Sequence, residues 1–248
     1  MQSELMKLEN VSLAYHTLAG ETVVIQNLNL SVLDGEFLAI VGPSGCGKTT
    51  VLSLIMGLMR PTSGSVRFSG KDLRLGYMLQ RDHLLDHRTV EKNVLLGLEV
   101  QHRLTEQSKA RAFELLDTYG LGDFRTYKPQ QLSGGMRQKV ALIRTLALEP
   151  DLLLLDEPFS ALDYQTRLNL CDEVCRIIRS EGKSAVLVTH DISEAISTAD
   201  RVAVFSARPA TLKTVIEIGF PKDMPPLERR SQAAFHDYFD RIWKELQP

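Results

Sequence analysis

The chain has 248 residues and a formal net charge of −2, so it carries no basic excess for neutralising the phosphates of a nucleic acid. Its 44% of hydrophobic residues is enough for a sizeable core in one large domain or two small ones. The longest aliphatic run, residues 152–155, falls far short of the roughly 20 residues of a membrane-spanning helix, and residues 1–9 lack the apolar core of a signal peptide.

The N-terminal part of the sequence predicts two paired strands, followed by a buried strand, a loop and a helix. Residues 5–15 and 22–32 have β patterns, and a turn at 19–21 between them predicts an antiparallel pair. Residues 37–41 are a continuous apolar run, which is typical of a strand buried on both faces. This run leads into a glycine-rich loop, after which residues 49–59 have a helical pattern.

The remaining pattern predicts a mostly parallel sheet flanked by helices. Short strands are expected first, then helices, and finally an alternation of strands and helices that is typical of parallel β-α-β units. The mostly helical stretch at about 84–131 is then an inserted subdomain. The predicted elements are 66–68, 75–79, 90–100, 106–119, 133–148, 152–155, 162–180, 184–188, 192–198 and 201–205.

The C-terminal tail predicts an amphipathic helix. Its apolar residues fall at intervals of three and four, which places them on one broad stripe. We favour a helix that docks on its own domain over one that binds a partner. The stripe consists of Phe235, Tyr238, Phe239, Ile242, Trp243 and Leu246.

The three cysteines have no spacing that suggests a disulfide framework, which favours a reducing cytoplasm. Cys171 and Cys175 are four residues apart in a predicted helix and therefore share a face. Two thiols without further Cys or His nearby make a poor metal site, so we expect them to be structural.

The glycine-rich loop matches the phosphate-loop pattern in full. Glycines let the backbone curl so that its N–H groups face an anion, and the following helix adds the positive end of its dipole. Lys48 is expected to reach the β- and γ-phosphates of a nucleotide, and the Thr49 hydroxyl to bind Mg²⁺. The expected nucleotide-binding residues are Gly42, Pro43, Ser44, Gly45, Cys46, Gly47, Lys48, Thr49 and Thr50.

Polar side chains also follow three other predicted strands. Asp156 and Glu157 end one of them, where Asp156 suits Mg²⁺ and Glu157 suits the polarisation of an attacking water. His190 ends another and is expected to hold the γ-phosphate or orient water, while Asp191 caps the next helix. Gln80 follows a third strand, where its amide is expected to complete the shell of the metal or water.

A second phosphate-binding element lies at 132–136. Ser133 suits a helix N-cap, and Gly134 and Gly135 expose the first N–H groups of that helix to an anion. Both elements cannot easily grip one γ-phosphate within one copy. The sequence therefore predicts that each copy offers Ser133 and its glycines to the nucleotide of the other copy.

These motifs occur in the order found in ATP-binding cassette (ABC) proteins, and the resemblance covers nearly the whole chain. It implies a P-loop NTPase core in a single ATPase domain over 1–248, with a C-terminal strand and helix at 208–248. ATP and Mg²⁺ are the implied ligands. The resemblance further implies that Tyr15 stacks on adenine, Gln80 senses metal and membrane partner, Glu157 is the catalytic base and Asp163 lies across the dimer seam.

Narrower phrases resemble the nitrate, sulfonate and taurine branch of bacterial importer ATPases. Two positions depart from the pattern: Met136 stands where Gln is commonest, and His87 where the branch often has Trp. The implied partners are a second copy or a paralogous ATPase, an integral-membrane permease and, indirectly, a solute-binding protein. The implied location is the cytoplasmic face of the bacterial inner membrane, as a peripheral protein. The phrases lie at 76–80, 84–90, 93–98, 136–138, 205–209 and 239–246.

Two other functions compete with an importer subunit. A soluble ABC ATPase acting on nucleic acid or ribosomes usually has two cassettes, a coiled-coil insert or basic extensions, and this chain has one cassette and no charge excess. A nucleotide-dependent phosphotransferase leaves the element at 132–136 unexplained. We therefore expect transport and no nucleic-acid partner.

Overall fold

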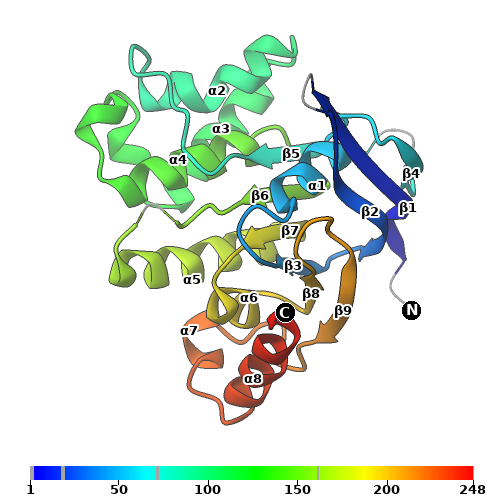
Figure 1. Cartoon of the computed structure of the whole chain (residues 1–248). Helices are drawn as coiled ribbons and strands as arrows, with labels where there is room; N and C mark the ends of the chain where they lie inside the picture. The colour runs from blue at the N-terminus through cyan, green and yellow to red at the C-terminus, as the bar shows by residue number, and fades with distance from the viewer. Residues whose placement is uncertain (1–2, 18–19, 71–72, 161, 248) are drawn as a thin grey trace. The chain divides into compact units, whose positions relative to one another are not determined.

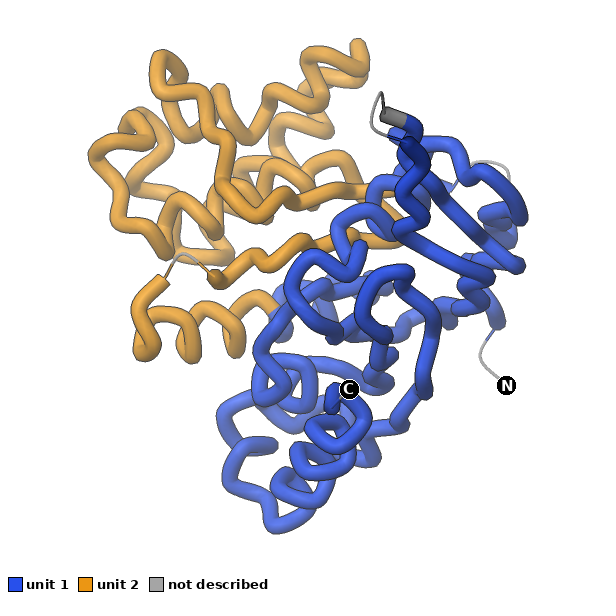
Figure 2. The backbone as a smooth tube through the Cα atoms, in the orientation of Figure 1, with its two compact units in different colours: residues 1–73, 175–248 blue, residues 74–174 orange. Residues whose placement is uncertain are grey.

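Two structural units divide the chain. The computed structural model describes residues 3–17, 20–70, 73–160 and 162–247 (Figure 1). The first unit comprises residues 1–73 and 175–248, and the second comprises residues 74–174 (Figure 2).

An antiparallel sheet opens the first unit. Strands β1 (Glu4–Thr17) and β2 (Gly20–Leu33) pair in register from Glu4 opposite Leu33 to Thr17 opposite Gly20. The predicted antiparallel pair is thus confirmed, although Ala19 of the predicted turn lies outside the described residues. Strand β4 (Ser63–Phe68) pairs with the other edge of β1.

Strand β4 begins three residues before the predicted start at 66. Gly64 has a left-handed backbone, φ 81°, and a side chain there would meet the Asn10 carbonyl oxygen at 2.3 Å. Glycine therefore lets the strand pass close to an irregular point in β1, between the pairs at Glu9 and Ser12. The sequence pattern does not reveal this earlier start, because glycine is common both in turns and at irregular points of strands.

The core sheet of the first unit runs in the order β7, β3, β8, β9. Strand β3 (Phe37–Val41) is buried along its whole length and pairs in parallel with β7 (Ser184–Thr189) and β8 (Arg201–Phe205). Strand β9 (Leu212–Glu217) is antiparallel to β8. The prediction of a strand buried on both faces is confirmed. The glycine-rich loop follows directly from the carboxyl end of β3.

Helix α1 (Lys48–Ile55) follows that loop and is shorter than the predicted 49–59. Gly57, with φ 75°, ends it: the Gly57 N–H donates to Leu54 at 3.1 Å and the Leu58 N–H to Ser53 at 2.9 Å. This pattern is the usual glycine stop at a helix C-terminus. Leu58 and Met59 continue the helical spacing of apolar residues, so the sequence pattern does not show where the helix ends.

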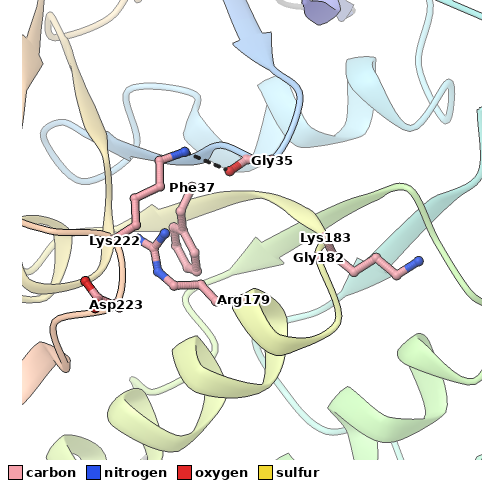
Figure 3. Close-up of a pocket in the computed structure, with 7 residues that line it drawn as sticks. All are labelled: Gly35, Phe37, Arg179, Gly182, Lys183, Lys222 and Asp223. Carbon is pink, nitrogen blue, oxygen red and sulfur yellow. Dashed lines mark hydrogen bonds between the residues drawn. The ribbon is translucent and has the colours of Figure 1, made fainter. Parts of the chain in front are cut away.

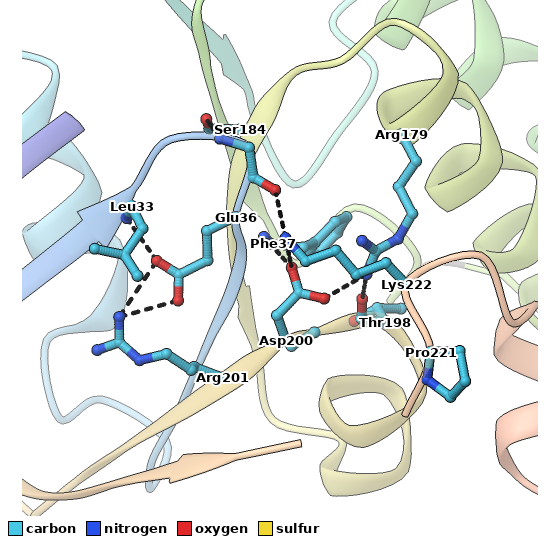
Figure 4. A network of polar contacts seen from close by, with 12 residues as sticks. Leu33, Glu36, Phe37, Arg179, Ser184, Thr198, Asp200, Arg201, Pro221 and Lys222 are labelled. Carbon is cyan, nitrogen blue, oxygen red and sulfur yellow. Dashed lines mark hydrogen bonds and ion pairs between the residues drawn. The ribbon is translucent and has the colours of Figure 1, made fainter. Parts of the chain in front are cut away.

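Charged groups fix the amino end of β3 (Figure 4). Glu36 is only 2% exposed and pairs with Arg201 at 3.0 Å, while burial raises the pKa of its carboxyl. Asp200 accepts the Phe37 backbone N–H and an Arg179 N–H, both at 2.9 Å. These bonds set the start of β3 against the neighbouring strand β8.

The second unit contains two parallel strands and the greater part of the helices. Strand β5 (Leu75–Met78) pairs in parallel with the fully buried β6 (Leu152–Asp156). Thr89, Thr105 and Ser133 accept backbone N–H groups as the N-caps of α2, α3 and α4. The helices are α2 (Val90–Val100), α3 (Glu106–Thr118), α4 (Gly134–Leu146) and α5 (Tyr164–Ser180), with short 3₁₀ turns at Gly122–Phe124 and Pro129–Gln131. Helix α5 continues across the unit boundary at 174.

Helices α6 (Ile192–Thr198), α7 (Pro226–Arg229) and α8 (Ala234–Leu246) complete the first unit. Helix α8 packs on α6, β8 and β9, which confirms that the tail docks on its own unit. The apolar stripe is only partly buried, however. Phe235 and Ile242 are buried, whereas Trp243 is 54% exposed and stacks on Phe239. None of the helices in the described part of the chain is long and apolar enough to cross a membrane.

Docking of α8 therefore depends on its buried face. Ile242→Ala is expected to lower the free energy of unfolding by about 2–4 kcal/mol, because it leaves a cavity at a fully buried site. Trp243→Ala, one residue away on the exposed side, is expected to cost less than about 1 kcal/mol. Urea unfolding followed by circular dichroism measures both, and equal losses would contradict the assignment of the two faces.

Candidate functional site

The loop between β3 and α1 has the backbone of an anion-binding nest. Gly45 and Gly47 have φ values of 73° and 123°. Gly47 is the N-cap of α1, and glycine has no side chain with which to cap that helix. A side chain at Gly47 would meet Val24 Cγ1 at 2.9 Å, and one at Gly42 would meet Phe205 Cβ at 3.0 Å. Close packing and the positive φ therefore require glycine at position 47, whereas a side chain at position 42 would make its neighbours shift by a few tenths of an ångström.

Lys48 carries a buried charge in this loop. It is 6% exposed, and its Nζ donates to the carbonyl oxygens of Gly42 at 2.8 Å and Pro43 at 3.1 Å. No carboxylate among the described residues forms a salt bridge with it. An ammonium that donates to backbone carbonyls at the N-terminus of a helix is suited to contact phosphate oxygens.

Two further side chains shape the loop. Cys46 is 1% exposed, and burial raises the pKa of its thiol although Lys48 opposes the effect. It is therefore a packed side chain. Arg208 donates to the Gly45 carbonyl oxygen at 2.8 Å. The sequence offered Arg208 only as part of a branch-specific phrase and gave no sign that it contacts the loop.

Tyr15 lies on β1 and is 39% exposed. It is opposite Thr22 on β2, and its hydroxyl donates to Met59 Sδ at 3.5 Å. Two residues along β2 from Thr22, Val24 packs against Gly47. The strand pairing thus places Tyr15 one strand away from the residue that contacts the phosphate loop.

His190 follows β7 in the same unit and is exposed. The next residue, Asp191, accepts the Glu194 N–H at 3.1 Å as the N-cap of α6, so the predicted cap is confirmed. The Glu194 side chain instead hydrogen-bonds to the Thr189 hydroxyl.

In the second unit, the carboxyl end of β6 brings together Asp156, Glu157 and Gln80. Asp156 is 5% exposed and accepts from the Tyr77 hydroxyl at 3.4 Å. Gln80 Nε2 donates to Glu157 Oε2 at 3.4 Å and to Ser160 Oγ at 3.3 Å. Two of the three strand ends predicted to carry polar residues therefore meet, because β5 and β6 are parallel neighbours.

Glu157 has an unusual backbone, with φ at 44°. A left-handed conformation costs a non-glycine residue about 1–3 kcal/mol and is common at functional sites. The Ser160 backbone N–H and hydroxyl both donate to the Glu157 carbonyl oxygen, at 3.2 and 3.0 Å, which secures the turn. The turn directs the carboxylate of Glu157 toward the Gln80 amide.

The element at 132–136 has the predicted helix cap. Ser133 is exposed, and its Oγ accepts the Met136 N–H at 3.3 Å. Side chains at Gly134 and Gly135 would meet Leu162 and Thr166 at 3.2 Å each. The two glycines thus also allow α4 to approach the start of α5.

Asp163 lies at that same start of α5. Its Oδ1 accepts the Thr166 N–H at 3.1 Å, and this hydrogen bond is the main cause that lowers the pKa of the Asp163 carboxyl. The carboxylate is fully exposed to solvent.

The described side chains also leave a separate hollow of about 300 Å³ in the first unit (Figure 3). It contains Phe37, the first residue of β3, so it lies at the strand end opposite the phosphate loop. None of the predicted site residues lines it. Its lining residues are Gly35, Phe37, Arg179, Gly182, Lys183, Lys222 and Asp223.

Comparison with known families shows which family the chain belongs to. The family described as ABC transporter matches residues 25–160 of the chain. The chain belongs to this family. Its members hydrolyse ATP, so the chain is an ATP-binding, ATP-hydrolysing subunit of a transporter, as its sequence resemblance implied.

Relatives match the chain over nearly its full length. It is 45% identical to the uncharacterized ABC transporter ATP-binding protein YtlC of Bacillus subtilis (strain 168), over 97% of this chain and 95% of that protein. It is 36% identical to the aliphatic sulfonates import ATP-binding protein SsuB of Bacillus licheniformis, over 92% and 88%. It is 38% identical to the nitrate import ATP-binding protein NrtD of Synechocystis sp., over 90% and 88%.

Solved structures confirm the predicted α/β P-loop fold. The chain superposes on the dimeric structure of MJ0796, a bacterial ABC transporter cassette, with a TM-score of 0.74 and 32% identity. The match covers 87% of this chain and all of that one. The predicted N-terminal antiparallel sheet is present in the chain as well.

The close packing at Gly47 predicts a specific loss of ATP affinity. Gly47→Ala is expected to weaken ATP binding by at least about tenfold, roughly 1.4 kcal/mol, because the new methyl group displaces the loop from Val24. Gly57→Ala is the matched control, since Gly57 also has a positive φ but no atom within 4 Å of a new Cβ. Titration with a fluorescent ATP analogue measures both, and equal losses would refute the steric argument.

Proposed function

We propose that the chain is the ATP-hydrolysing subunit of a membrane importer, forming one cassette over residues 1–248. The observation that carries the proposal is the match to relatives named for import, SsuB and NrtD, over 92% and 90% of the chain. Residues 84–131 serve as the helical subdomain and residues 208–248 as the C-terminal strand and helix. The protein sits at the cytoplasmic face of the bacterial inner membrane, bound to a permease that receives solute from a binding protein.

The phosphate loop binds ATP through its backbone and Lys48. Backbone N–H groups of the loop and the N-terminus of α1 surround the phosphates, and the Lys48 ammonium contacts the β- and γ-phosphate oxygens. Thr50 and the loop residues from Gly42 to Thr49 form the cradle, while Tyr15 stacks on the adenine. The buried ammonium and the two positive-φ glycines support this assignment.

Oxygen donors suited to Mg²⁺ are present in the Thr49 hydroxyl, the buried Asp156 carboxylate and the Gln80 amide. No group of three or more His, Cys, Asp or Glu side chains suited to a metal occurs among the described residues. When bound, Mg²⁺ neutralises charge that develops on the phosphates.

Glu157 acts as the general base for the attacking water, and His190 orients that water or holds the γ-phosphate. The Gln80 amide, which donates to Glu157, positions the carboxylate and senses the permease. The left-handed backbone of Glu157 supports a functional role for this residue.

Two copies, or one copy and a paralogous ATPase, close around two ATP molecules. Ser133, Gly134 and Gly135 contact the nucleotide held by the other copy, and Asp163 lies at the seam between them. The exposure of Ser133 and Asp163 supports this arrangement, as does the dimeric structure of MJ0796. Met136 replaces the commonest residue of this element, but Ser133 and the backbone N–H groups remain available to a phosphate.

We further propose a small solute of the nitrate, sulfonate or taurine kind. The branch-specific phrases and the two relatives named for nitrate and sulfonates support this class. Other relatives are named for choline and for spermidine and putrescine, so the choice of solute requires a direct test.

Replacing the base tests the two-copy arrangement. Glu157→Gln is expected to retain ATP binding, lose at least about 99% of turnover and remain dimeric with ATP, because hydrolysis is what reopens the sandwich. Size-exclusion chromatography with light scattering, with and without ATP, measures the assembly. Lys48→Ala is the matched variant that should fail to dimerise through lost ATP binding, and a Glu157→Gln chain that stays monomeric with ATP would contradict the proposal.

A reconstituted transporter tests the solute. The chain is reconstituted in liposomes with the permease and the binding protein that are encoded beside it. ATP hydrolysis is then measured with nitrate, an alkanesulfonate, taurine, choline or spermidine. We expect stimulation of at least about threefold by one of the anionic solutes or taurine and none without the permease. Stimulation by choline or spermidine alone would overturn the solute class, and stimulation by RNA or DNA would support the soluble alternative.

A further inference from the structure

Two arginines of α4 hold the loop that follows Gln80, and both belong to the second unit. The Arg144 guanidinium donates to the His83 carbonyl oxygen at 2.9 Å and to the Asp82 carbonyl oxygen at 2.7 Å. His83 has φ at 44°, a conformation that non-glycine residues seldom adopt. One side chain of α4 therefore secures a strained turn of the Gln80 loop through two consecutive carbonyls.

Arg137 connects the same turn to the start of α4. Its Nε donates to Asp82 Oδ2 at 3.1 Å, and its Nη1 to the Leu132 carbonyl oxygen at 3.4 Å. Leu132 is the residue before Ser133. The other oxygen of Asp82 accepts the Leu84 N–H at 3.1 Å, so this carboxylate also stabilises its own loop.

The later part of the same loop is bonded to α2. The Asn93 side chain is fully buried, and its Oδ1 accepts the Leu85 N–H at 2.7 Å. Its Nδ2 donates to the carbonyl oxygens of Leu85, Arg88 and Thr89 at 3.0 to 3.2 Å. The loop is consequently bonded along its length, and Gln80 at its beginning reaches Glu157.

We propose that Arg144 and Arg137 are positioning residues for ATP hydrolysis. They join the loop that carries Gln80 to the helix that starts after Ser133, so that the two elements move as one piece. This inference rests on the proposed function, in which Gln80 serves the nucleotide of its own copy and Ser133 that of the other. Lys48 and the phosphate loop belong to the first unit, so ATP affinity is not expected to depend on the two arginines.

Hydrogen exchange on the full chain tests the join without any assay of function. Arg144→Ala is expected to speed amide exchange in residues 80–89 by at least about tenfold, while Arg144→Lys, which cannot contact two carbonyls with one planar group, gives a smaller increase. Arg111→Ala is the matched control, because Arg111 pairs with Glu114 on α3. Unchanged exchange at 80–89 in folded Arg144→Ala and Arg144→Lys chains would overturn the proposal.

A double-mutant cycle on ATP hydrolysis tests whether the arginine acts through Gln80. Arg144→Ala is expected to lower kcat about tenfold with the Kd for ATP within about twofold of wild type. Combined with Gln80→Ala, it should lower kcat no further than Gln80→Ala alone. Multiplied effects would overturn the proposal. Retained turnover in Glu157→Gln would instead refute the proposed function, and the exchange result would still decide whether the join exists.

Discussion

Burial of one positive charge organises the nucleotide end of the first unit. The Lys48 ammonium is almost inaccessible to solvent and is held by carbonyls of the loop that precedes it. Removing an ammonium from water is costly unless strong partners replace the water, and two neutral carbonyls replace it only in part. The loop can curl around the charge only because Gly47 adopts a positive φ with no room for a side chain beside Val24. The buried strand β3, fixed at its amino end by Glu36, Arg201 and Asp200, holds the loop in place.

The second unit contains two residues with strained backbone conformations near the proposed site. Glu157 and His83 both have positive φ, and each is secured by hydrogen bonds to its own or the neighbouring carbonyl. Such residues persist where surrounding contacts overdetermine them. Gln80 lies between the two strained turns, with an amide that donates to Glu157. The Gln80 side chain is exposed, and its amide is bound to this region through hydrogen bonds of 3.4 Å to Glu157 and 3.3 Å to Ser160.

Strand and helix positions followed from the sequence where local pattern and burial agree. The apolar runs of β3 and β6 and the caps at Ser133 and Asp191 were predictable, because each rests on residues close together in the chain. The early start of β4 and the early end of α1 were not predictable. Each depends on one glycine, Gly64 in β4 and Gly57 after α1, whose role is set by its contacts or its φ. At the site, parallel pairing of β5 and β6 accounts for the meeting of Gln80 and Glu157. The contacts of Arg208, Arg137, Arg144 and Asn93 had no sequence signal, because an arginine or asparagine in a helix or loop is ordinary until its distant partner is known.

The glycines of the element at 132–136 have a packing role besides the ligand contact that we propose for them. Gly134 and Gly135 allow α4 to lie close to Leu162 and Thr166, so a side chain at either position would make these neighbours shift by a few tenths of an ångström, near the start of α5 where Asp163 lies. Their small size thus eases packing within one copy. The Ser133 side chain caps the helix by accepting the Met136 backbone N–H, and this hydrogen bond does not involve the side chain at 136. A methionine in place of the commoner glutamine therefore leaves the cap and the glycine packing unchanged. Only the contacts made by the side chain at 136 differ.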